Sequence, residues 1–248
     1  MLEARSAADF TTTHWSEIQA ARTATPGRRQ AVLDNLARRY WKPVYRYLRA
    51  RGHDEADARD ITQDFFVEAI LGRDLFGQAD PHKGRFRPYL LHCLKNFTRE
   101  RHRRDAAARR APDRPVLSLD LWTDTGSSHH EPAAPGAAPD DIFHRQWAAS
   151  LLELVLERLN AACRQSGLET HYAVFCERFV RPALEHAAAT PLEALAGRFG
   201  LTVKQVANRG ETVRRRFRSL LLDEVRQTVL DQEAAEEELR ALLAHLRG

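Results

Sequence analysis

Two adjoining stretches decide the fold: DEADARDITQDFFVEAI at residues 54–70 and KGRFRPYLLHCLKNFTRERHRR at residues 83–104. In the first, Ala58, Ile61 and Phe65 recur at the three- and four-residue spacing of one apolar helix face. Four carboxylates repeat with the same spacing on a neighbouring stripe: Asp57, Asp60, Asp64 and Glu68. Such a row is tolerated as solvated surface, and it becomes useful where a basic partner docks.

The second stretch predicts a helix of the opposite charge. Leu90 and Leu94 continue a buried stripe, while nine positive residues against two negative ones give residues 85–110 a local charge of +7. Charge runs are most often solvated surface. Here Phe86 and Tyr89 accompany the charge, and cations beside aromatic rings favour a nucleic-acid backbone with unstacked bases.

The composition limits the classes of protein to consider. The 248 residues have a formal net charge of +4 and a sequence pI of about 9.2, and the charge is arranged in blocks of one sign. Three scattered cysteines show no metal-binding spacing, so we expect reduced thiols and no cofactor. No apolar run resembles a signal core or a membrane span, and we therefore expect a cytoplasmic protein without a membrane partner.

The pattern along the chain predicts an all-α protein with two helical domains joined by an extended linker. We expect the first domain at residues 1–110, the linker at 111–141, the second domain at 142–230 and an acidic helical extension at 231–248. The linker prediction rests on five prolines, two glycines and a net charge of −5.

Residues 190–222 predict a helix-turn-helix. Thr190 to Glu193 has the form of a capping box, Gly200 is suited to a left-handed helix end, and Thr202 with Gln205 forms a second capping box. Two short capped helices joined by a tight turn are typical of DNA-binding proteins and also of other helical hairpins. Polar side chains at the start of the second helix can reach base edges or phosphates: Lys204, Gln205, Asn208 and Arg209.

Together these motifs resemble a bacterial RNA polymerase sigma factor of the extracytoplasmic-function (ECF) type. Residues 56–66 resemble that family's helix for binding core polymerase, residues 84–104 its segment for strand opening and minus-ten recognition, and residues 195–206 its minus-thirty-five helix-turn-helix. The extended linker and the C-terminal leucine stripe are typical of a long-linker, C-terminally extended subgroup.

The resemblance implies three sets of binding residues. Core polymerase would be bound by Asp57, Asp60, Gln63, Asp64 and Phe66. The minus-ten strand would be bound by Arg85, Phe86, Tyr89, Lys95, Asn96, Arg99, Arg103 and Arg104, with Asn96 at the position that holds a flipped base. The minus-thirty-five duplex would be bound by Lys204, Gln205, Asn208, Arg209, Arg215 and Arg216.

Two residues of the predicted recognition helix depart from the family pattern. Gly210 weakens a helix by up to about 1 kcal/mol, and Glu211 brings an anion near DNA. The implied partners are core RNA polymerase and promoter DNA. An anti-sigma factor or another regulatory protein is a further partner that the sequence leaves open.

Two other functions compete with this interpretation. A helix-turn-helix transcription regulator that never engages polymerase accounts for the second half of the chain and leaves the acidic helix as ordinary surface. An enzyme would need metal or catalytic residues at matching spacing, and neither His53-Asp54 nor His129-His130 has such partners. We therefore expect no enzymatic activity.

Overall fold

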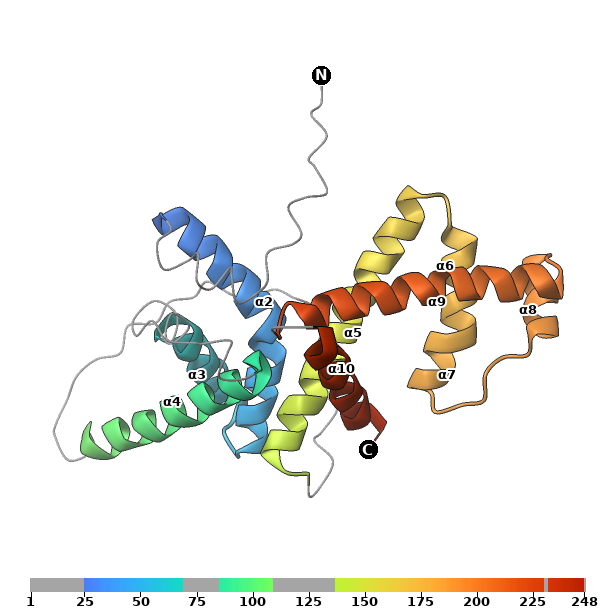
Figure 1. Cartoon of the computed structure of the whole chain (residues 1–248). Coiled ribbons are helices and arrows are strands. Elements are labelled where there is room, and N and C mark those ends of the chain that lie inside the picture. Colours follow the sequence, from blue (N-terminus) through green and yellow to red (C-terminus); the bar gives the residue numbers. More distant parts are fainter. Residues whose placement is uncertain (1–24, 69–84, 109–136, 230–231, 248) are drawn as a thin grey trace. The chain divides into compact units, whose positions relative to one another are not determined.

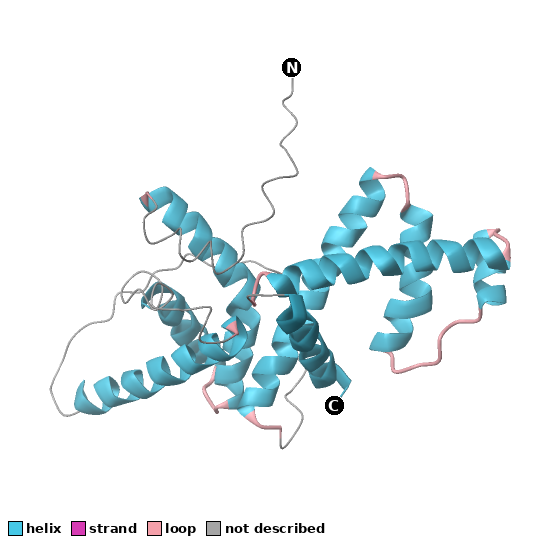
Figure 2. Cartoon of the chain, in the orientation of Figure 1, coloured by secondary structure: helices cyan, strands magenta, loops and turns pink. Residues whose placement is uncertain are grey.

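The computed structural model describes residues 25–68, 85–108, 137–229 and 232–247. In these ranges the regular structure is helical and contains no strand (Figure 2). The predicted all-α class is therefore confirmed. Most of the predicted linker, including its apolar patch near Leu119, lies outside the described residues.

The chain divides into two compact units, with the boundary between Gln146 and Trp147. This boundary falls inside one helix, α5 (Pro139–Gln165), whose first turn includes the last three residues of the predicted linker. The beginning of α5 therefore belongs to the first unit, and the remainder of the helix belongs to the second.

The first unit is built from α2 (Pro26–Ala50), α3 (Glu55–Val67), α4 (Phe86–Ala108) and the start of α5 (Figure 1). Asp54 begins α3, since its carboxylate accepts a hydrogen bond from the backbone N–H of Asp57 at 2.8 Å. Helix α2 continues through Pro43.

Aromatic and leucine side chains from all four helices fill the core of this unit. Phe65 and Phe97 join α3 to α4 with ring centroids 5.5 Å apart, and Phe143 of α5 meets Tyr47 of α2 edge to face. Phe65 and Phe143 have no exposed surface. Burying such a side chain contributes about 1.5–3 kcal/mol, so the apolar stripes hold the charged faces of α3 and α4 in place.

The second unit continues from α5 through three short segments, α6 (Glu169–Phe175), a π-helical turn (Cys176–Val180) and α7 (Arg181–Leu184). Pro182 follows the π-helical turn. Because proline cannot donate to the carbonyl four residues earlier and its ring needs space there, a wider turn suits the residues before it.

Three further helices complete this unit: α8 (Leu192–Phe199), α9 (Val203–Arg226) and α10 (Gln232–Arg247) (Figure 1). Helix α9 packs against α6 and α8 as well as α10. Leu159, Phe175 and Val213 join α5, α6 and α9 in one core cluster. The leucine stripe of the C-terminal extension also faces inward, since Leu242 is buried.

Candidate functional site

The acidic stripe of α3 combines paired carboxylates with one that has no partner among the described residues. Asp57 accepts from Nδ1 of His53 at 2.5 Å, and Asp64 forms an ion pair with Arg101 of α4. Asp60 is exposed and has no hydrogen bond or ion pair within the described residues. The stripe is therefore partly neutralised by the unit itself, and Asp60 is its most available charge.

The other two residues of the predicted polymerase-binding set are less accessible. Gln63 is half-buried. The ring of Phe66 is buried and stacks on Trp41 of α2 with centroids 6.1 Å apart. Phe66 is a core residue in this structure, so a role in binding would be indirect, by holding α3 against α2.

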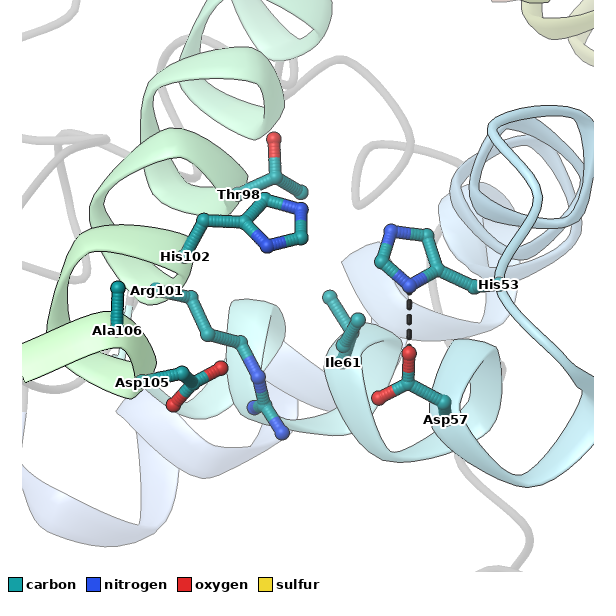
Figure 3. Close-up of a pocket in the computed structure, with 8 residues that line it drawn as sticks. All are labelled: His53, Asp57, Ile61, Thr98, Arg101, His102, Asp105 and Ala106. Atoms are coloured by element: carbon teal, nitrogen blue, oxygen red, sulfur yellow. Dashed lines mark hydrogen bonds and ion pairs between the residues drawn. The ribbon is translucent and has the colours of Figure 1, made fainter. Parts of the chain in front are cut away.

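A cavity of about 300 Å³ lies between α3 and α4 (Figure 3). The rings of His53 and His102 face each other across it with centroids 5.8 Å apart, and Ile61 lies at its base. Its wall also carries Arg101 and Asp105. The lining therefore mixes one arginine with two aspartates and two histidines. The described residues contain no cluster of three or more His, Cys, Asp or Glu placed to hold a metal ion.

The basic face of α4 has a central polar residue and cations along one side. Asn96 is exposed, and its side chain contacts His92 at 2.8 Å and accepts from Arg99 at 3.3 Å. Arg103 is exposed and unpaired within the described chain. The contacts of Asn96 with His92 and Arg99 lie at an exposed surface, where they are weak enough for a nucleic acid to replace them.

Two other cations of this predicted set are held by carboxylates. Nζ of Lys95 lies 2.5 Å from Asp140 in the first turn of α5. Arg104 lies 3.4 Å from Glu68 of α3 and 3.4 Å from Glu100 one turn earlier on α4. The sequence did not predict the Lys95–Asp140 and Arg104–Glu68 pairs because each joins separate helices.

The residues at the start of α4 differ in exposure. Arg85 and Tyr89 are half-buried, whereas Phe86 has no exposed surface and its ring lies 5.3 Å from that of Tyr40. The predicted stacking of a base on Phe86 therefore has no exposed ring here. In this structure Phe86 packs α4 against α2.

In the second unit, a tight turn joins α8 to α9, as a helix-turn-helix would require. Gly200 ends α8 with φ 63°, and the N–H of Leu201 returns to the carbonyl of Ala196 at 3.0 Å. Thr202 then caps α9: its hydroxyl accepts from the N–H of Gln205 at 3.2 Å, and Gln205 Oε1 accepts from the N–H of Thr202 at 2.9 Å. The second predicted capping box is confirmed.

The first predicted capping box is wrong. Helix α8 begins at Leu192 with Pro191 at its N-cap and no side-chain cap bond. Tertiary contacts hold Thr190 instead, since its carbonyl accepts from Arg178 at 2.5 Å and its hydroxyl lies 3.3 Å from the carbonyl of Glu177.

The predicted DNA-contacting residues of α9 are distributed as follows. Lys204, Asn208, Arg215 and Arg216 are exposed; Arg209 is half-buried; Gln205 is exposed, but its side chain is used in the cap. Burial, followed by the nearby charges of Arg209 and Arg216, lowers the pKa of His171 on α6. Two of the cations of α9 therefore lie close enough to α6 to act on His171.

The structure accounts for both departures from the family pattern. Arg214 neutralises Glu211 at 2.9 Å, and its guanidinium lies over the ring of Phe179. Gly210 is buried where α9 crosses α6 and the π-helical turn that follows it. A Cβ at residue 210 would lie 3.4 Å from Phe179 in that turn and 3.6 Å from Val174 of α6. The glycine therefore lies at a close helix crossing, and Glu211 does not present an unpaired anion.

Part of the first unit matches a known protein family. Residues 36–108, which span most of α2 together with α3 and α4, match the family model for sigma-70 region 2. The matched part of the chain is therefore similar to sigma-70 region 2. No curated protein and no solved structure matches the chain significantly. Among the described helices, none is both long enough and apolar enough to cross a membrane.

Proposed function

We propose that this chain is a sigma factor of the ECF type, in the long-linker, C-terminally extended subgroup. The observation that carries the proposal is the region 2 match, because it coincides with a folded unit that presents an acidic α3 beside a basic α4. The helix-turn-helix in the second unit supports it from a separate part of the chain.

Binding of core polymerase would begin at α3. Asp60 is exposed and unpaired within the described part of the chain, so it can approach a basic surface without first losing an internal contact. Asp57 and Asp64 would contribute less at first, since Asp57 is already hydrogen-bonded to His53 and Asp64 is already paired with Arg101. An exposed charge pair contributes about 0.2–1 kcal/mol, so tight binding would also need the surrounding polar and apolar contacts.

Capture of the minus-ten strand would use the exposed side of α4. Asn96 would hold a flipped base, and Arg99 and Arg103 would contact the phosphates beside it. Each phosphate contact of this kind makes the binding constant for a single strand fall as the salt concentration rises. The slope of the logarithm of the binding constant against the logarithm of the salt concentration changes by roughly −0.7 per contact.

Contact with the minus-thirty-five duplex would use the start of α9, where Lys204 and Asn208 can reach base edges in the major groove. Arg215 and Arg216, two turns further along, would contact phosphates. In this scheme the chain acts by binding and catalyses no reaction itself. It would work in the cytoplasm, with a regulatory protein such as an anti-sigma factor as a further partner.

The direct test is binding of the full chain to purified core RNA polymerase. Asp60→Lys is the sharpest variant because it reverses an exposed charge without breaking a pair within the described residues. Glu157→Lys on α5 makes the same charge change at another exposed residue and serves as the control. The proposal predicts binding that Asp60→Lys weakens at least tenfold, a factor that corresponds to about 1.4 kcal/mol, and that Glu157→Lys leaves unchanged.

Absence of polymerase binding with duplex DNA binding retained would overturn the proposal. That result would instead favour a helix-turn-helix regulator that never engages polymerase. Equal weakening by both variants would show that binding follows net charge and does not use α3 as proposed.

A further inference from the structure

The first turn of α5 makes a contact that the proposed function does not use. Its Asp140 lies 2.5 Å from Nζ of Lys95, and both side chains remain partly accessible, at 45% and 32% exposure. Lys95 adjoins Asn96, which is at the centre of the proposed strand-binding surface. An acidic side chain of the chain itself therefore lies against that surface.

Apolar packing holds this turn in place. Phe143, one turn after Asp140, has no exposed surface, and its ring meets that of Tyr47 edge to face with centroids 6.4 Å apart. Tyr47 is itself buried. The position of Asp140 is therefore fixed by a core contact and does not depend on the ion pair alone.

A further cation lies on the same helix as Lys95. Arg99 follows Lys95 by one turn of α4 and is exposed. Burial raises the pKa of Tyr47, and the charges of Arg51, Lys95 and Arg99 act in the opposite direction.

A lysine held by one carboxylate, with an arginine one turn further along the same helix, offers the positive charge that a phosphate group requires. We propose that Asp140 occupies a phosphate-binding site formed by Lys95 and Arg99, and that a backbone phosphate of a single nucleic-acid strand displaces it. Asp140 is then an internal competitor for the strand-binding surface. This inference rests on the proposed function, since it concerns strand capture by the same unit.

The test compares strand affinity among charge variants of the full chain. The probe is a fluorescein-labelled twelve-nucleotide oligothymidylate, followed by fluorescence anisotropy in low potassium chloride. Asp140→Asn removes the competitor. Asp141→Asn is the matched control because Asp141 is exposed in the same helical turn, carries the same charge and has no ion pair within the described residues.

Asp140→Asn is expected to tighten binding about fivefold, the scale of one partly exposed ion pair, and Asp141→Asn much less. In a Lys95→Gln background the gain from Asp140→Asn should disappear, because the cation that Asp140 neutralises is absent. Equal gains from Asp140→Asn and Asp141→Asn, or a gain that persists without Lys95, would overturn the proposal. Circular dichroism melting shows whether each variant folds, and Asp140→Ser repeats the comparison with a smaller side chain.

Potassium phosphate at matched ionic strength separates a strand phosphate from a free anion. The gain is expected to persist in phosphate; its loss there would show that the site takes the free ion and would overturn the assignment to a strand. If no variant binds the oligonucleotide, the site assignment also fails.

Core polymerase binding by the same variants keeps the two proposals distinguishable. Polymerase binding with no specific Asp140 effect would leave the proposed function standing without this site. An Asp140 effect without polymerase binding would establish the site and overturn the proposed function.

Discussion

Replacing Gly210 with alanine is expected to stabilise the second unit, even though this glycine is buried at a helix crossing. A Cβ at residue 210 would lie 3.4 Å from Phe179 and 3.6 Å from Val174, which are ordinary contact distances. Alanine is more favourable than glycine inside a helix by about 0.8–1.0 kcal/mol. We therefore expect the free energy of unfolding to rise by about 1 kcal/mol, with a rise in melting temperature of about 4 °C for a unit of this size.

A larger side chain at the same residue should have the opposite effect. Leucine at residue 210 must displace Phe179 or Val174, and overpacking of this kind typically costs about 1–3 kcal/mol. Gly197 on α8 is the matched control, since it is an exposed helical glycine with nothing within 4 Å of a Cβ. Both Gly197→Ala and Gly197→Leu should therefore stabilise.

Urea unfolding of the full chain, followed by far-ultraviolet circular dichroism, measures all four variants. A Gly210→Leu variant as stable as Gly197→Leu would refute this prediction, because α9 would then not pack closely on α6 and the π-helical turn that follows it. The prediction is equally refuted if Gly210→Ala lowers stability by more than about 1 kcal/mol, the size of the expected gain.

Four further variants test other contacts by the same unfolding measurement. Thr202→Ala removes the cap of α9 and should cost about 1 kcal/mol; no change would show that the capping box does not stabilise the turn. The lowered pKa of His171 means that the unfolded chain binds a proton more readily, so stability present above pH 6.5 is lost as the pH falls below it. His171→Gln should flatten that dependence, and an unchanged profile would contradict it. Arg158→Leu removes the ion partner of the buried Glu224 and should cost about 2 kcal/mol. The double variant Arg158→Leu/Glu224→Leu should recover most of that loss, and equal instability of the two would contradict the assignment.

The elements predicted best were those whose signals are local. Apolar spacing located α3 and α4, while Gly200 and the Thr202–Gln205 pair located the turn between α8 and α9. In each case the residues that fix the backbone lie within four positions of one another, so a single sequence contains the information.

The missed features depend on partners distant in the sequence. Thr190 does not cap α8 because Arg178 and Glu177 hold it, and neither contact is visible from the local pattern. Helix α5 begins at Pro139, inside the predicted linker, and Phe143 completes the core of the first unit.

In the candidate binding surfaces, too, the sequence predicted local features but not contacts with distant residues. Sequence spacing placed Asp60 and Arg103 on charged helix faces, and the structure has both exposed. Asn96, which only the family resemblance singled out, is exposed as well. Sequence spacing could not show that Phe66 and Phe86 face the core, since an aromatic ring at helical spacing suits either face of such a helix. Nor could it show that Asp140 meets Lys95, a pair separated by 45 residues.

The most direct test of the central claim is transcription by core RNA polymerase with and without the purified chain, on a library of genomic DNA fragments, with 5′ ends mapped by sequencing. The account predicts initiation at discrete positions that depends on the chain, shares upstream sequence elements and is lost with Asp60→Lys. Polymerase that binds the chain yet initiates no differently from core alone would contradict it.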